Sequence, residues 1–526
     1  MKSLLLLTFV ITSSLSFSQT WADDVAQIVY EKCTKCHHSG GVGPFPLMTY
    51  GETSPMASLI DAAVTQDVMP PWPPNNNFQN YAHDRSLSTL EKATLLAWLN
   101  GGTPEGNPTN TPPPPVYNVG SILGNGDLEV QIPTYMSKAT TTSDDYVCFA
   151  IPSNLATGRI IKSVEVVPGN PSIVHHCLVY IDANSNGSVT DTVGGDCQGP
   201  SSPTAKLVSG YTPGSTPTVL PSVSPLKLGY SMAANSQVYL GMHFPEGSYG
   251  EYDSTKVIFH FYPETETGIR QLSTDILLDN WTFSLPPDQI TDVSDVYPNS
   301  GAGLPIDYSL LAVFPHMHLI GESMKVYGIK PSLDTLKLID IPAWDFEWQD
   351  FYYYNYMQKA EAGTILHADA VYNNTSANLN NPNDPPITVG AGLNTADEML
   401  VVFMSYLPYV VGDENYNMDS LLNLSTNALL EKEFGPGMFT VYPNPFSSNI
   451  TLTTSQLQAG DNISMFVYDI QGQKVKELLL NHTANSGTFE VNWDGKNESG
   501  ANIANGMYYI SINLNGVLSQ QRVIKN

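Results

Sequence analysis

Histidines occur in this chain at spacings that suit metal binding. His316 and His318 stand two residues apart, and on a β-strand such residues point to the same side, so both imidazoles can bind one ion without distorting the backbone. His175 and His176 are neighbours, which point to opposite faces of a regular strand, so sharing an ion requires a bulge or a strand end. His243 could complete a site of three imidazoles with this pair. Taken singly, each of these histidines could equally be an ordinary half-buried residue.

The segment from Cys33 to His37, with the sequence CTKCH, predicts a covalently attached heme. The thiols of Cys33 and Cys36 can join the two vinyl groups, and the imidazole of His37 can bind the iron. The alternative is a thioredoxin-like or zinc CxxC motif, but neither a second CxxC nor a βαβ pattern accompanies it. We therefore expect covalent heme c as a cofactor.

A heme that carries electrons needs a second axial ligand, for which Met48, Met56 and Met69 are the candidates. Met69 is followed by Pro70 and Pro71, which stiffen the loop, and a thioether ligand raises the reduction potential of the iron. We select Met69; the alternative is a core methionine that fills a gap in the packing.

The charge balance limits the possible partners. Among 526 residues, 22 are Lys or Arg and 50 are Asp or Glu, which gives a net charge of −28. So acidic a protein repels phosphate backbones, and nucleic-acid binding is excluded as a function. Since 42% of the residues are apolar and 10% aromatic, there is enough material for packed cores. The 40 glycines and 39 prolines, with short apolar runs between them, favour many strands and turns over long helices.

The first residues predict export. A short apolar run follows Lys2, and the small residues Ser16 and Ser18 stand at the positions that a signal peptidase reads. We interpret residues 1–18 as a removed signal peptide; the alternative is a membrane anchor, but the run is much shorter than the roughly 20 residues that a span needs. The mature protein is expected to be secreted or held at the cell surface. Five cysteines cannot all pair in an oxidising compartment, so at least one has another role.

Composition divides the rest of the chain into domains. Two helix-like stretches, Trp21 to Lys32 and Ser88 to Asn100, predict a small helical domain, whereas strand-like runs prevail after residue 116. The strand-rich part is too long for one sandwich, so we divide it near Gly268. The expected parts are 19–107 for the heme domain, 108–118 for a Pro-rich linker, 119–267 and 268–430 for two β domains, and 436–526 for a small β module. The expected fold class is therefore multidomain and mainly β.

Several ordered motifs resemble those of the copper type II ascorbate-dependent monooxygenases, the family of peptidylglycine α-hydroxylating monooxygenase and dopamine β-monooxygenase. The resemblance covers residues 127–409 and rests on Asp145–Cys148 (DYVC), Val174–His176 (VHH), Val238–His243 (VYLGMH), Phe314–Gly321 (FPHMHLIG) and Asp397–Met399 (DEM). It implies two jelly-roll-like antiparallel β-sandwich domains, each with one copper ion. It also implies dioxygen, a small-molecule substrate and an electron donor, either ascorbate or a redox protein, as partners.

The resemblance also implies two sets of copper ligands. The electron-storing copper would be bound by His175, His176 and His243. The catalytic copper, where dioxygen binds, would be bound by His316, His318 and Met399. A thioether beside two imidazoles selects copper, especially cuprous copper, over zinc or magnesium. Without the resemblance we would take Met399 for a core residue of its apolar strand, as we take Met404. His260 and His367 are expected to be structural.

The same resemblance implies a disulfide between Cys148 and Cys197. Cys177 then stays unpaired directly after the histidine pair. A free thiol there is either a small core residue or a neighbour that perturbs the copper, and we favour the core.

The sequence departs from the family around the substrate. In the peptide-hydroxylating members an arginine stands two residues before the His-x-His pair, where this chain has Phe314, and an Asn and a Tyr are replaced here by Val401 and Phe403. A substrate carboxylate would lose its bidentate partner, so we expect a more apolar substrate than an amidation precursor. Peptide amidation as a third hypothesis predicts a cationic residue near Phe314, for which Arg270 and Lys325 are the candidates.

Residues 32–106 resemble the small cytochrome c domains that precede copper monooxygenase modules. The shared motifs are Gly43–Leu47 (GPFPL), Met69–Trp72 (MPPW), Asp84-Arg85 and Leu87-Ser88. This resemblance supports Met69 as the second ligand of the iron.

The last part of the chain resembles the C-terminal sorting domain of type IX secretion substrates, with a β-sandwich fold. The motifs are 439–445 (FTVYPNP), 466–470 (FVYDI), 493–495 (WDG), 506–508 (GMY) and 522–525 (RVIK). The resemblance implies recognition by the type IX secretion machinery and passage across the outer membrane, followed by release or surface attachment. The alternative is a carbohydrate-binding β-sandwich.

These features predict a secreted copper-dependent monooxygenase that hydroxylates a C–H bond of a small organic substrate with dioxygen. The fused heme c is expected to relay the electrons, rather than or besides ascorbate, because the Pro-rich linker keeps donor and acceptor close. The alternative is a secreted heme or copper electron-transfer protein, or a copper-binding protein, without hydroxylase activity. An exposed apolar cleft beside Met399 would favour the enzyme, and a filled one would favour the alternative.

Overall fold

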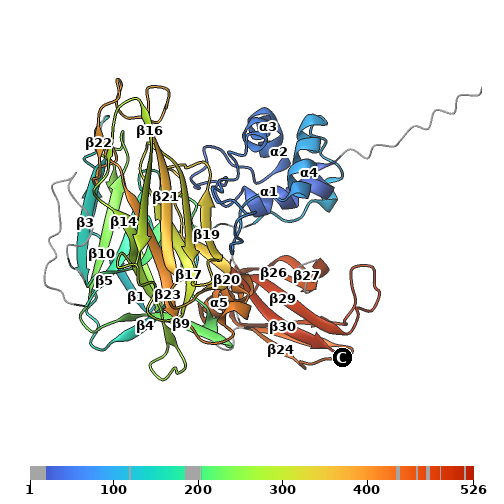
Figure 1. Cartoon of the computed structure of the whole chain (residues 1–526). Helices are drawn as coiled ribbons and strands as arrows, with labels where there is room; N and C mark the ends of the chain where they lie inside the picture. Colours follow the sequence, from blue (N-terminus) through green and yellow to red (C-terminus); the bar gives the residue numbers. More distant parts are fainter. Residues whose placement is uncertain are drawn as a thin grey trace, which may run out of the picture. The chain divides into compact units, whose positions relative to one another are not determined.

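The computed structural model of the chain (Figure 1) divides into two compact units. It describes residues 19–115, 117, 120–141, 143–183, 202, 204–433, 439–457, 460–469, 474–485, 487–514 and 517–526, so the predicted signal peptide lies outside the described residues. The first unit comprises Met1–Trp72 and Arg85–Tyr117, and the second Pro73–Asp84 and Asn118–Asn526. Within the described ranges, no helix combines the length and the apolar character that a membrane span requires.

The first unit is helical, with helices at both predicted stretches. A helical turn at Trp21–Val25 leads into the first of the four α-helices in the described residues of this unit, which are α1 (Ala26–Lys32), α2 (Tyr50–Thr53), α3 (Ala57–Thr65) and α4 (Thr89–Asn100). Ser88 and Glu91 cap α4 reciprocally, each side chain accepting from the other's backbone N–H. Trp21 and Trp98, each at most 1% exposed, pack together in the centre with ring centroids 5.9 Å apart. The apolar faces of α1 and α4 thus form the core that holds the CTKCH segment.

Residues 73–84 belong to the second unit, although the expected domain 19–107 includes them. Their backbone hydrogen-bonds to β19 (Thr335–Ile341) and β20 (Tyr352–Ala360) of the second unit, with Asn75 donating to Asp340 and Ala82 to Tyr353. Tyr81 is buried and donates its hydroxyl to the carbonyl of Leu338. These backbone pairs account for the difference, because a segment without helical periodicity takes its structure from the strands that it meets.

The first β domain contains two main sheets, one of seven strands and one of four. The larger has β1 (Leu128–Gln131), β12 (Lys256–Phe261), β4 (Arg159–Val167), β9 (Leu226–Met232) and β13 (Arg270–Gln271) in this order, with β7 (Thr218–Val219) on β4 and β8 (Ser222–Val223) on β9. The smaller has β3 (Asp145–Pro152), β10 (Gln237–Phe244), β5 (His176–Asp182) and β6 (Lys206–Tyr211). A short pair, β2 (Tyr135–Met136) with β11 (Tyr252–Asp253), accompanies them.

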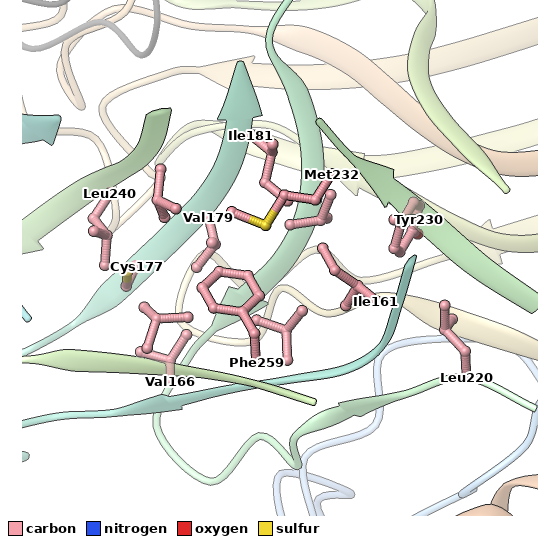
Figure 2. Close-up of a cluster of buried hydrophobic side chains, with 14 of the residues drawn as sticks. Ile161, Val166, Cys177, Val179, Ile181, Leu220, Tyr230, Met232, Leu240 and Phe259 are labelled. Carbon is pink, nitrogen blue, oxygen red and sulfur yellow. The ribbon is translucent and has the colours of Figure 1, made fainter. Parts of the chain in front are cut away.

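Apolar residues of the two sheets gather in one core. Figure 2 shows Phe259 and Ile161 of the larger sheet among Val179 and Leu240 of the smaller. Alternate residues along β5 face this core, as period-two strands require. The strand β13, which lies beyond the boundary expected at residue 267, still pairs with β9.

The second β domain contains two main sheets as well, and both are four-stranded and antiparallel. One has β14 (Ser273–Asn280), β23 (Leu400–Pro408), β17 (Tyr308–His316) and β20 in this order. The other has β16 (Gln289–Tyr297), β21 (Ile365–Asn374), β18 (Gly321–Ile329) and β19. A short pair, β15 (Ser284–Leu285) with β22 (Val389–Gly390), lies outside them. The mainly β organisation predicted from the strand-like runs is therefore present.

A helix, α5 (Met418–Glu433), closes the part for which only strands were expected. Met418, Leu421 and Leu422 are buried in a core cluster that contains residues of both β domains. The C-terminal module follows as two sheets, β24 (Phe439–Tyr442), β25 (Ile450–Leu457) and β28 (Gly487–Trp493) in one, and β27 (Lys474–Thr483), β26 (Asn462–Asp469), β29 (Gly506–Leu514) and β30 (Val517–Lys525) in the other. Their shared core contains Ile450 and Trp493.

Candidate metal centres

The first histidine set converges at the end of β5. His176 is the first residue of β5 and pairs across the sheet with His243 of β10. His175 precedes the strand, so the alternation of a regular strand does not hold it on the opposite face. The Nδ1 atom of His176 lies 3.3 Å from that of His175 and 3.2 Å from that of His243. The strand end thus supplies the irregularity that a shared ion requires.

This cluster has the properties of a nitrogen-ligated metal site. One ligand atom from each of its three imidazoles lies within 4.8 Å of the others. Burial lowers the pKa of His176 well below its usual value, as do the charges of His243 and His175. Burial likewise lowers the pKa of His243. Neutral imidazole is the metal-binding form, and imidazole donors suit copper and zinc, so the residues fit the copper ion that the sequence predicts.

Carboxylates meet the outward nitrogens of two of these rings. His175 Nε2 lies 2.7 Å from Oε2 of Glu347, and His243 Nε2 lies 3.3 Å from Oδ2 of Asp144. The hydrogen bond with His175 lowers the pKa of Glu347. Burial alone would raise the pKa of Asp144, but the contacts with His243 and with the hydroxyl of Thr395 lower it. The hydrogen bond at His175 fixes which nitrogen of that imidazole carries the proton and leaves the other for the metal.

The second set lies at the end of β17. His316 is the last residue of this strand and pairs with Val401 of β23, and the imidazole centroids of His316 and His318 are 5.1 Å apart. Met399 directly precedes β23 and stands two residues before Val401, which places both on one face of an extended chain. Met399, Val401 and Phe314 belong to one buried cluster. The strand pairing therefore brings the methionine to the face of β17 that carries the histidines.

The outward nitrogens of the second pair are also occupied. His316 Nδ1 lies 2.5 Å from the side-chain oxygen of Gln349, and His318 Nδ1 lies 3.0 Å from the carbonyl oxygen of Asp397. Burial lowers the pKa of His318 to about 3, with a smaller contribution from His316. Nε2 of each neutral ring therefore keeps a lone pair that can bind a metal ion. With the soft thioether of Met399, this set suits cuprous copper.

Glu398 holds the backbone around the second set. Its carboxylate accepts hydrogen bonds from the N–H groups of His318, Ile320 and Met399. The side chain is fully buried, and burial raises its pKa to about 7 although these hydrogen bonds act in the opposite direction. One carboxylate thus ties the segment after β17 to Met399, the residue directly before β23.

A loop that the sequence analysis did not single out contacts ligands of both sets. We name residues 343–351, between β19 and β20, the bridging loop. The ring of Phe346 stacks on His175 with centroids 5.9 Å apart and meets His318 edge-on at 6.1 Å. Glu347 and Gln349 provide the contacts described above. No spacing rule reveals these residues, since their partners lie far away in the sequence; the only signal is the density of aromatic and polar residues in AWDFEWQDF.

The apolar side chains beside Met399 are packed rather than exposed. Phe314, Met399, Val401 and Phe403 are each at most 9% exposed and cluster with Leu207 of the first β domain. Of the two arrangements that would discriminate the hypotheses, an exposed or a filled apolar cleft beside Met399, the structure has the filled one.

Neither cation named for peptide amidation serves Phe314. Arg270 binds the carboxylate of Asp413 and the carbonyl of Pro408, at the end of β23 remote from Met399. Lys325 lies on β18, in the other sheet, 3.5 Å from a carboxylate oxygen of Asp340. The structure thus provides no support for a carboxylate-binding cation from either residue.

The CTKCH segment directly follows α1, with both thiols free. His37 Nδ1 lies 3.0 Å from the carbonyl oxygen of Phe45, which leaves Nε2 as the donor for a metal. A Cβ atom at Gly43 would lie 2.7 Å from His37 Nδ1, so a glycine is needed for this close approach. Burial raises the pKa of the Cys33 thiol to about 12. These residues fit a covalently attached heme.

Met69 lies in the loop after α3 and is half-buried, with its N–H directed at the carbonyl of Ala63 at 3.3 Å. Met48 and Met56 are also half-buried, and Met56 packs against the core of the first unit. Met69 therefore remains the predicted iron ligand because of its proline-stiffened loop.

The cysteines outside the CTKCH segment differ in their pairing and their surroundings. Cys148 is disulfide-bonded, and Cys197, its expected partner, lies outside the described residues. Cys177 is fully buried in the core of the first β domain, one residue after His176 and hence on the other face of β5. The thiol is thus a core residue, as we favoured.

Comparison with known proteins supports the copper monooxygenase family. Residues 285–420 match the copper type II ascorbate-dependent monooxygenase, C-terminal domain. The chain is 27% identical over 315 residues to the DBH-like monooxygenase protein 1 of Mus musculus, a match that covers 56% of this chain and 48% of that protein. The chain thus spans about half the length of this relative.

Residues 446–516 match the FlgD Ig-like domain. Among solved structures, PorZ, a surface component of the type IX secretion system of Porphyromonas gingivalis, is 24% identical over 17% of this chain and 11% of its own, with a TM-score of 0.13. Dimeric latent PorU of the same organism is 11% identical over 73% of this chain and 34% of its own, with a TM-score of 0.15. Scores this low bear on neither the fold nor the function.

Proposed function

We propose that this protein is a copper-dependent monooxygenase that hydroxylates a C–H bond of a small, apolar organic substrate. The observation that carries the proposal is the pair of ligand sets at the ends of β5 and β17, which contain five buried or half-buried imidazoles. In the first set nitrogens of three rings converge, and in the second set the contacts at Nδ1 leave Nε2 of each ring for a metal. The match of residues 285–420 to the monooxygenase domain supports it. The reaction consumes the substrate, dioxygen, two electrons and two protons, and it yields the hydroxylated product and water.

The residues of the second set and the apolar side chains beside them have different roles in this reaction. When bound, copper supplies one-electron redox chemistry and the activation of dioxygen. His316 and His318 present neutral nitrogens, and the thioether of Met399 favours the reduced ion. Phe314 and Phe403 supply apolar surface that excludes water and suits an uncharged C–H donor. A substrate carboxylate buried there would lack a cationic partner, which costs more than its contacts return.

The first set serves as the electron store in this proposal. Three imidazoles without a thioether form the predicted site of His175, His176 and His243. Phe346 contacts one imidazole of each set, so a single half-buried side chain touches both His175 and His318. That contact supports electron transfer between the two ions.

We also propose that a heme c on Cys33, Cys36 and His37 supplies electrons to the copper ions, rather than or besides ascorbate. The tautomer of His37 and the free thiols support the heme. A protein with Cys33→Ala and Cys36→Ala should lose its covalent heme and turn over slowly with redox-protein donors while it retains turnover with ascorbate. Normal turnover of this variant with every donor tested would refute the relay.

Export completes the proposal. Residues 1–18 are proposed to direct the chain out of the cytoplasm, and residues 436–526 to serve as a type IX sorting domain that leaves the protein secreted or surface-attached. The two-sheet structure of the C-terminal module agrees with this role but is equally that of a carbohydrate-binding β-sandwich. Deletion of residues 436–526 should retain the protein inside the cell envelope, as judged by its absence from the culture medium and the cell surface.

One observation favours the alternative of an electron-transfer or copper-binding protein. The apolar side chains beside Met399 are packed against Leu207 rather than exposed, so substrate entry requires the two β domains to separate locally. The decisive experiment incubates the metallated, reduced protein with ¹⁸O-labelled dioxygen and a panel of small metabolites. Label in one product, found by mass spectrometry, supports the enzyme; dioxygen consumption without labelled product supports the alternative.

A further inference from the structure

Glu347 belongs to the second β domain, but its carboxylate contacts a predicted copper ligand of the first. The residue lies in the bridging loop, between β19 and β20. Its Oε2 atom lies 2.7 Å from Nε2 of His175, which precedes β5 of the first domain. The ring of the preceding residue, Phe346, stacks on the same imidazole at an interplanar angle of 18°. The second domain therefore both hydrogen-bonds and covers His175.

The geometry separates the role of Glu347 from that of a ligand. The Nδ1 atoms of His175, His176 and His243 face one another at 3.2 to 3.3 Å along the cluster, so an ion shared by the three rings lies on their Nδ1 side. Glu347 meets the opposite nitrogen of His175. An acceptor at Nε2 holds the proton there and leaves the lone pair of Nδ1 for the metal.

The exposure of the two side chains indicates whether the contact between Glu347 and His175 matters more for folding or for metal binding. The side chain of Glu347 is 63% exposed, whereas that of His175 is 13% exposed. An exposed ion pair adds little to the stability of a fold. Outer partners of metal-bound histidines, in contrast, typically change metal affinity by about 10- to 100-fold. The contact between Glu347 and His175 is therefore of more consequence for metal binding than for folding.

We propose that Glu347 is a positioning residue that completes the three-histidine centre from the neighbouring domain. The inference rests on the proposed two-copper function and deepens it. The bridging loop also places Gln349 against Nδ1 of His316, so one loop orients a ligand of each centre. Docking of the second domain then sets the tautomer and the plane of His175, which couples the geometry of the electron store to that of the catalytic centre.

The test measures copper binding rather than turnover. Full-length protein with His318→Ala, which disables the second centre, serves as the background for Glu347→Ala and Glu347→Gln. Glu322→Gln is the matched control, because Glu322 is an exposed carboxylate on β18 of the same domain. Copper(II) affinity is measured by competition with a chelator of known affinity, and the copper hyperfine splitting by electron paramagnetic resonance.

We expect Glu347→Ala to weaken copper binding at the three-histidine centre by about 10- to 100-fold and to change the hyperfine splitting. Glu347→Gln retains an oxygen acceptor and should lose less, and Glu322→Gln should match the background. The thermal midpoint of the metal-free protein should be the same in all variants. Unchanged affinity and spectrum in Glu347→Ala would overturn the proposal, and so would a lowered thermal midpoint of the metal-free variant, which would assign Glu347 a structural role.

A double-mutant cycle separates a contact with His175 from a general charge effect. In a His175→Ala background, Glu347→Ala should cause no further loss of copper affinity, whereas a full additional loss would contradict the assignment. Failure of this inference is distinguishable from failure of the proposed function. A protein that binds copper and responds to Glu347→Ala but forms no labelled product retains the inference and loses the enzyme.

Discussion

The side-chain oxygen of Gln349 lies 2.5 Å from Nδ1 of His316, so a residue of the bridging loop decides which nitrogen of this histidine can face an ion. The amide of Gln349 is itself oriented, because its NH₂ group donates to the carbonyl of Phe346. Its oxygen therefore accepts the Nδ1 proton, and Nε2 carries the lone pair. Gln349 is only 8% exposed, so water cannot readily replace it.

Substitution of Gln349 should weaken the second copper centre. Gln349→Leu removes the acceptor at similar volume and leaves a buried N–H without a partner, which should lower copper affinity at the His316 and His318 site by about 10- to 100-fold. Gln349→Glu keeps an oxygen acceptor and should lose less. Cu(I) titration against a chromophoric chelator measures the effect, and Gln289→Leu, at an exposed position of β16, is the control. Equal affinities for both Gln349 variants and wild type would contradict the orientation described here.

Met399→Leu should abolish hydroxylation while the fold is retained. The substitution conserves volume, so it should cost less than about 1.5 kcal/mol of folding free energy, but it removes the soft ligand that stabilises the reduced ion. Product formation and Cu(I) stoichiometry, with an expected loss of one ion per chain, are the measurements. Met404→Leu is the matched control, because Met404 is a fully buried methionine of β23, the strand that Met399 directly precedes. Product formation by Met399→Leu at the rate of Met404→Leu would exclude Met399 as a ligand.

The metal-free protein should lose stability in acid through His318. Burial lowers the pKa of this residue to about 3, so between pH 6.5 and 3 the unfolded chain binds a proton that the folded chain does not. Stability then falls as the pH falls, with a slope of up to about 1.4 kcal/mol per pH unit for one histidine. Glu398, whose pKa burial raises to about 7, acts in the opposite direction.

The measurement therefore compares wild type with His318→Asn. Urea midpoints of both metal-free proteins at pH 7.5 and pH 5 give the pH dependence of each, and the loss of stability should be smaller in the variant. An equal loss in both proteins would show that His318 is not held neutral by burial.

Cys177 should matter for stability and not for copper. The thiol is fully buried in the core of the first β domain, so Cys177→Ser should destabilise the protein by about 1 to 3 kcal/mol through a buried hydroxyl. Copper stoichiometry and the copper(II) spectrum should remain those of wild type. Cys177→Ala, which adds no polar atom, should cost less. A changed copper spectrum at unchanged stability would instead assign the thiol to the copper environment.

The sequence predicted more of the fold where the apolar pattern follows a single period. The helices around Trp21–Lys32 and Ser88–Asn100 are present, as are the strands on either side of residue 268. Helix α5 was missed although Met418, Leu421 and Leu422 recur at helical spacing, because the division by composition assigned its residues to the β part. Residues 73–84 have no period of their own, and only their pairing with β19 and β20 determines where they belong.

The candidate site likewise has residues that the sequence indicated and residues that it could not. The two-residue spacing of His316 and His318 indicated a shared ion from residue positions alone, whereas the ordered motifs gave the two complete ligand sets through the resemblance to a known family. The sequence could not identify Glu347, Gln349 or Phe346, because the partner of an outward-facing nitrogen is whatever another element brings within about 3 Å. That distance depends on how two domains dock.

The amino-acid sequence by itself determined the kinds of candidate donor in this protein: the imidazoles of closely spaced histidines, and the paired thiols with an imidazole in the CTKCH segment. Those are properties of side chains and of local strand geometry, which need no tertiary contact. Only the tertiary structure decided which nitrogen each histidine offers, that Met399 shares a buried face with Phe314, and that one loop contacts ligands of both centres. Tautomer, burial and contact arise from groups far apart in the chain, and folding alone brings them together.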